Sequence, residues 1–86
     1  MKKFTYRIQK DFAMHFGPAW RLAEITRVYP DTTAFLEMGS RRADISRPMK
    51  VATMGIRKGD IVKVTAEGDS EVELIDVLYQ YFEDAM

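Results

Sequence analysis

His15, the single histidine of the chain, is the residue best suited to chemistry, and it stands three residues before Pro18. Proline suits the first turn of a helix because its φ is already helical and its missing N–H costs nothing there. Helical spacing then continues through Ala19, Leu22, Ala23 and Thr26. His15 is therefore expected at or next to the N-cap, where unpaired N–H groups and the helix dipole attract anions, phosphate above all. An imidazole in that position is a candidate phosphoryl acceptor; the alternative is a solvated or capping side chain.

Length and composition restrict the class of protein. Eighty-six residues, 47% of them hydrophobic, predict one domain over residues 1–86 with a core large enough for two layers. Without cysteine there are no disulfides or thiolate metal sites, and one histidine is too few for the usual zinc clusters. No metal or cofactor is therefore expected. No stretch resembles a signal peptide or a membrane span, so we expect a soluble, cytoplasmic protein without membrane insertion, monomeric by default.

The formal net charge is zero, but the charges are unevenly placed. All thirteen Lys and Arg residues lie between Lys2 and Lys63 with six acids, a net of +7, whereas the other seven acids lie between Glu67 and Asp84. One interpretation is a solvated acidic helix on a mildly basic body; the other is a positive face that steers an acidic partner. Nucleic acid is not an expected partner, because basic and aromatic residues do not interleave as a single-strand platform requires.

Periodicity places seven elements. Alternation at Phe4, Tyr6 and Ile8 predicts a first strand, and the loop over 10–14 leads into the helix after His15, which should end at Tyr29 before Pro30. Strands over 32–38 and 41–45 are joined by a turn at 39–40, and a short helix over 49–54 precedes a strand over 61–66. A closing helix carries an apolar stripe of Leu74, Ile75, Leu78, Tyr81 and Phe82.

The order βαββαβα predicts an α+β fold, a two-layer open-faced sandwich. Its four-stranded antiparallel sheet should carry three helices on one face. Two serines are expected to begin helices: Ser46 should cap the short helix ahead of Pro48, and Ser70 with Glu73 has the spacing of a capping box.

Three segments, in this order and spacing, resemble the HPr family, the histidine-containing phosphocarrier proteins of the bacterial phosphoenolpyruvate-dependent sugar phosphotransferase system. They are His15 with Pro18 and Ala19, residues 49–56, and residues 58–68. The resemblance covers essentially the whole chain. It implies a carrier, not a turnover enzyme: His15 would accept a phosphoryl group on Nδ1 from enzyme I and pass it to IIA domains.

The phosphoryl group would be bound by the N–H groups near Phe16 and Gly17, which can stabilise charge as it develops. Gly17 replaces the arginine that the family usually carries two residues after the histidine, and arginine is the fitting bidentate partner of phosphate. Arg21, one turn further on, is the candidate substitute.

The expected partner surface surrounds His15 and consists of Phe16, Trp20, Arg21, Met49 and Lys50. Phe16 and Trp20 replace small residues of the family, so this surface should be bulkier and more aromatic. Gram-positive members also carry a regulatory serine just before the second helix; here Ser46 stands one residue early and is the candidate phosphosite. The alternative function is that of a non-catalytic regulatory or binding protein on the HPr fold, which recognises a protein partner without carrying phosphate.

Overall fold

The sheet of the computed structural model, which describes residues 1–11 and 15–86, has four antiparallel strands. They are β1 (Lys2–Arg7), β2 (Thr32–Met38), β3 (Arg41–Asp44) and β4 (Ile61–Gly68), in the spatial order β1-β4-β2-β3. β4 lies between β1 and β2, so that Phe4 and Leu36 both stand opposite Val64. Gly39, at φ +60°, and the next residue form the predicted hairpin turn, which sets Met38 opposite Arg41.

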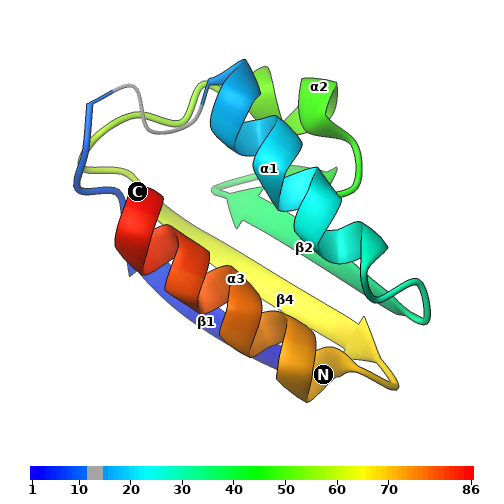
Figure 1. The fold of residues 1–86 in the computed structure, drawn as a ribbon. Helices are drawn as coiled ribbons and strands as arrows, with labels where there is room; N and C mark the ends of the chain where they lie inside the picture. The colour runs from blue at the N-terminus through cyan, green and yellow to red at the C-terminus, as the bar shows by residue number, and fades with distance from the viewer. Residues whose placement is uncertain (12–14) are drawn as a thin grey trace.

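Three helices cover one face of this sheet in the described part of the chain: α1 (Phe16–Arg27), α2 (Pro48–Ala52) and α3 (Glu71–Ala85) (Figure 1). The predicted α+β sandwich is confirmed. Inward-facing strand residues meet the apolar stripes of the helices in one core, whose largest fully buried side chains are Ile8, Leu22, Leu36, Ile45, Val51, Val62, Val64, Leu74, Leu78, Phe82 and Met86. Within the described ranges, no helix is long and apolar enough to cross a membrane.

Several element ends differ from the prediction. α1 ends at Arg27, not Tyr29, because the N–H of Tyr29 bonds to the carbonyl of Thr26 in a tighter closing turn. α2 covers 48–52 and is shorter than predicted, whereas β4 extends to Gly68, which pairs with Thr32. Residues 12–14 of the predicted loop lie outside the described residues.

Ser46 does not cap α2, so that prediction is wrong. The N-cap is Arg47, and no side chain caps the helix. The hydroxyl and the N–H of Ser46 instead donate to Oδ1 of Asp44, at 2.7 and 2.9 Å. The ionised carboxylate of Asp44 is a strong acceptor two residues away. It holds Ser46 in the turn that leaves β3, so the hydroxyl is not used as a cap of α2.

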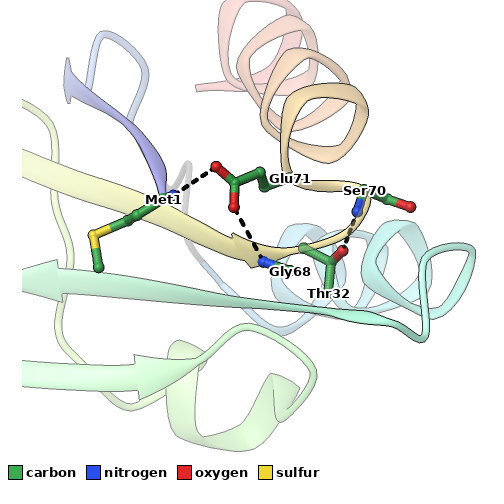
Figure 2. Close-up of polar contacts among 5 residues, drawn as sticks. All are labelled: Met1, Thr32, Gly68, Ser70 and Glu71. Carbon is green, nitrogen blue, oxygen red and sulfur yellow. Dashed lines mark hydrogen bonds and ion pairs between the residues drawn. The ribbon is translucent and has the colours of Figure 1, made fainter.

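Ser70 is the N-cap of α3, but the predicted capping box with Glu73 does not form. Its hydroxyl donates to Asp31, and its N–H donates to the hydroxyl of Thr32 at 2.8 Å. Glu71 accepts from the N–H of Gly68 and pairs with the amino group of Met1 (Figure 2). These contacts lower the pKa of the Glu71 carboxyl, the N-terminal amine having the largest effect. The beginning of α3 is thus bound to Met1 and to the start of β2 instead of being capped by its own side chains.

Candidate functional site

The imidazole of His15 is exposed at the N-cap of α1, as the sequence predicts. Its backbone is extended (φ −110°, ψ −170°), and its Nδ1 accepts a hydrogen bond from the N–H of Gly17 at 3.2 Å. A ring nitrogen that accepts carries no proton, so the neutral ring holds its proton on Nε2. His15 is therefore a cap of α1 through Nδ1.

The first turn of α1 limits which N–H groups can bind an anion here. The N–H of Ala19 already bonds to the carbonyl of His15 at 3.1 Å, and Pro18 has none. Among the described residues, the N–H groups of Phe16 and Gly17 remain at this helix end, where the dipole is positive, and that of Gly17 already donates to Nδ1 of His15. Two of the three residues expected from the sequence to bind a phosphoryl group, Phe16 and Gly17, thus directly follow His15 at the beginning of α1.

Arg21, the third residue expected to bind the phosphoryl group, lies on the side of α1 that borders α3. It lines a shallow pocket of about 390 Å³ between α1 and α3, together with Glu24, Ile25, Val28 and Tyr81. Burial raises the pKa of the Tyr81 hydroxyl, and the nearby charge of Arg21 opposes that shift. Among the polar contacts of residues 1–11 and 15–86, none joins Arg21 to His15.

Exposed aromatic side chains continue from His15 along α1. Phe16 and Trp20 are 49% and 42% exposed, and their ring centroids lie 5.7 Å apart. The guanidinium of Arg27 lies over the Trp20 ring, 5.5 Å from its centroid, close enough for a cation–π contact. The sequence analysis missed Arg27; its spacing of two helical turns from Trp20 is the signal that could have identified it.

α2 packs against α1 beside this end of the helix (Figure 1). Met49, 62% exposed, and the exposed Lys50 lie on α2. All five predicted partner-binding residues thus lie on α1 and α2, and one of them, Arg21, lines the pocket that borders α3. Exposed methionine and aromatic side chains with neighbouring cations are typical of protein-binding surfaces.

Comparison with known proteins agrees with this architecture. Residues 2–84 match the PTS-HPr family, described as the PTS HPr component phosphorylation site. The crystal structure of HPr-C-His from Thermoanaerobacter tengcongensis is similar, with a TM-score of 0.89, 26% identity, and coverage of 99% of this chain and 94% of that one.

Two further structures show the same fold at lower identity. The histidine-containing phosphocarrier protein of Mycoplasma has a TM-score of 0.90 at 22% identity, covering 96% of this chain and 93% of that one. The phosphocarrier protein HPr of Bacillus anthracis has a TM-score of 0.82 at 16% identity, covering 93% and 94%. Because the family match takes in nearly the whole chain, this protein belongs to the HPr family, whose members are phosphocarriers of the phosphotransferase system rather than catalysts.

Proposed function

We propose that this protein carries a phosphoryl group on Nδ1 of His15, accepting it from enzyme I and donating it to IIA domains of the sugar phosphotransferase system. The observation that carries the proposal is the exposed imidazole at the N-cap of α1, with Nδ1 on the N–H of Gly17. A neutral imidazole nitrogen is an effective nucleophile toward phosphorus, and the helix N-terminus favours the charge that arrives with the phosphoryl group.

Transfer requires the ring to turn, because the Nδ1 lone pair is directed at the N–H of Gly17. Once free, Nδ1 attacks phosphorus, and the bond from phosphorus to the donor breaks as the Nδ1–P bond forms. The donor leaves with the electron pair, and the proton of His15 stays on Nε2. Phosphoryl oxygens then take over as acceptors for the N–H groups of Gly17 and Phe16.

The surface that would bind enzyme I and IIA domains is apolar at its centre and basic around it. Phe16, Trp20 and Met49 provide the exposed apolar groups, and Lys50 and Arg21 provide positive charge. Such a surface combines buried anchors with electrostatic steering of an acidic partner.

Ser46 is the candidate regulatory phosphosite. Its side chain is exposed, and its hydroxyl donates to Asp44. Phosphorylation would replace that donor with a dianion facing a carboxylate, so we expect the modified serine to leave Asp44 and to open the turn ahead of α2.

The proposal is tested by following phosphate from phosphoenolpyruvate through enzyme I to this protein and on to a IIA domain. We expect an adduct that is labile in acid and stable in base, because a phosphoryl group on imidazole nitrogen has that chemistry. His15→Ala should abolish both uptake and donation, while Ser40→Ala, an exposed change in the hairpin turn, should alter neither. If enzyme I phosphorylates a control HPr but not this protein, the alternative of a binding protein without phosphate replaces the proposal.

A further inference from the structure

The indole of Trp20, the single tryptophan of the chain, contacts an aromatic ring and a cation on its own helix. The ring of Phe16, one turn before it, lies 5.7 Å away between centroids, at an interplanar angle of 33°. The guanidinium of Arg27, two turns after it, lies over the indole, 5.5 Å from the ring centroid. Both distances fall within the ranges of favourable aromatic and cation–π contacts. A side chain that is 42% exposed is thus restrained by two neighbours along α1.

The geometry of an α-helix explains why these three side chains meet. Residues separated by seven positions lie about 20° apart around the helix axis, so Arg27 and Trp20 share a face of α1. The side chains of a helix also lean toward its N-terminus, which directs Arg27 back over Trp20 and Trp20 back toward Phe16. Among the ion pairs of residues 1–11 and 15–86, none involves Arg27, so no carboxylate holds its guanidinium elsewhere.

We propose that Arg27 is a positioning residue, which with Phe16 holds the indole of Trp20 in place as a preformed anchor for enzyme I. Residues 2–63, which include α1, carry a net charge of +7, so the anchor is presented to an acidic partner. A flexible side chain loses conformational entropy when a partner immobilises it, and a side chain that is already held loses less. The choice of enzyme I as the partner rests on the proposed function, whereas the restraint of Trp20 by Arg27 does not.

Arg27 also lies in the last turn of α1, where the helix dipole favours any cation, and the variants have to separate this effect from the contact with Trp20. Arg27→Gln, at an exposed position, removes both the charge and the contact. Arg27→Lys keeps the charge at the helix end and restores part of the cation–π contact. Arg42→Gln is the matched control, because the guanidinium of Arg42 lies over the ring of Phe35, 3.7 Å from its centroid, on β2 and β3 instead of α1.

The motion of the indole tests the restraint without any partner protein. Because Trp20 is the only tryptophan, its Nε1–H gives a single indole signal in a ¹⁵N spectrum, and the heteronuclear NOE of that signal reports motion on the picosecond-to-nanosecond timescale. We expect this NOE to fall in Arg27→Gln, to recover in part in Arg27→Lys, and to stay unchanged in Arg42→Gln. An unchanged NOE in Arg27→Gln would overturn the restraint.

The affinity for enzyme I tests whether Arg27 acts through Trp20. Dissociation constants are measured for the unmodified protein, Arg27→Gln, Trp20→Ala and the double variant. Arg27→Gln should raise the dissociation constant roughly 2- to 10-fold, the cost of immobilising one side chain, and should have no effect once Trp20 is alanine. No effect in either background, or equal effects in both, would overturn the positioning role. If enzyme I binds a control HPr but not this protein, the proposed function is wrong instead, and the NOE still decides whether Arg27 holds Trp20.

Discussion

Nδ1 of His15 caps α1, and the proposed function gives the same nitrogen a second purpose that excludes the first at any one moment. As a cap it accepts from the N–H of Gly17, and as a nucleophile it has to release that bond. The place of His15 just before a helix was predictable from Pro18 and from the helical spacing of the apolar residues that follow. The 3.2 Å bond was not, because it depends on a side-chain rotamer that no sequence pattern encodes.

Gly17→Arg should speed phosphoryl uptake, because a guanidinium adds charge-assisted hydrogen bonds to the incoming dianion. One such bond is worth about 1.5–3 kcal/mol, or roughly one to two decades in rate. The measurement is the rate of uptake from phosphorylated enzyme I. Gly17→Ala is the matched control, since it adds a side chain without adding charge, and equal rates for the two variants would contradict a role for the guanidinium.

Arg21→Ala is tested by the same measurement, the rate of phosphoryl uptake from phosphorylated enzyme I. Because Arg21 borders Tyr81 and α3, we expect its removal to slow uptake only if the guanidinium turns toward the phosphoryl group.

At the scale of elements, periodicity placed every strand and helix, and the errors lie at their ends. Alternation and apolar stripes are repeated over many residues, so they survive local exceptions. Caps depend on single contacts between distant residues: the partners of Ser70 are Asp31 and Thr32, and these are neighbours only in the folded chain. The error at Ser46 has a local cause, because its acceptor Asp44 stands only two residues earlier, at the end of the preceding strand.

Gly68, at the end of β4, should tolerate no side chain. Its φ is +147°, and a Cβ there would contact the carbonyl of Asp31 and lie 2.6 Å from the Cα of Thr32. Gly68→Ala should therefore cost about 3 kcal/mol or more of stability, from backbone strain and collision with a neighbouring strand.

Gly39→Ala is the control for this substitution, because Gly39 also has positive φ but has nothing within 4 Å of an added Cβ. It should cost about 1–2 kcal/mol. Denaturant unfolding measures both losses, and equal losses would show that the contact with β2 is relieved without cost.

Charge is distributed across the whole molecule in the way the sequence indicates. Residues 67–84, which include the end of β4, the turn after it and most of α3, carry seven acids and no base, whereas the body that includes α1 and α2 has a net charge of +7. The exposed Phe16, Trp20 and Met49 belong to this basic body. This arrangement favours encounter with an acidic protein from the side of α1 and α2, with a rate that falls as salt rises.

Backbone-shift mapping with enzyme I or a IIA domain should therefore locate the contact around Phe16, Trp20 and Met49. Trp20→Ala should weaken binding roughly tenfold, as the loss of an aromatic anchor does. Val72→Ala, at a half-exposed apolar position on α3, should leave the affinity unchanged. Backbone chemical-shift changes confined to the open face of the sheet would exclude the surface around His15 as the binding site.

The most direct test of the central claim is NMR of the protein labelled with ¹⁵N in its single histidine, after incubation with phosphoenolpyruvate and enzyme I. The account predicts a ³¹P signal coupled to Nδ1 of His15, together with loss of the Gly17 N–H bond to that nitrogen. A phosphoryl group on Nε2 or on another residue, or no phosphoryl group while enzyme I labels a control HPr, would contradict it.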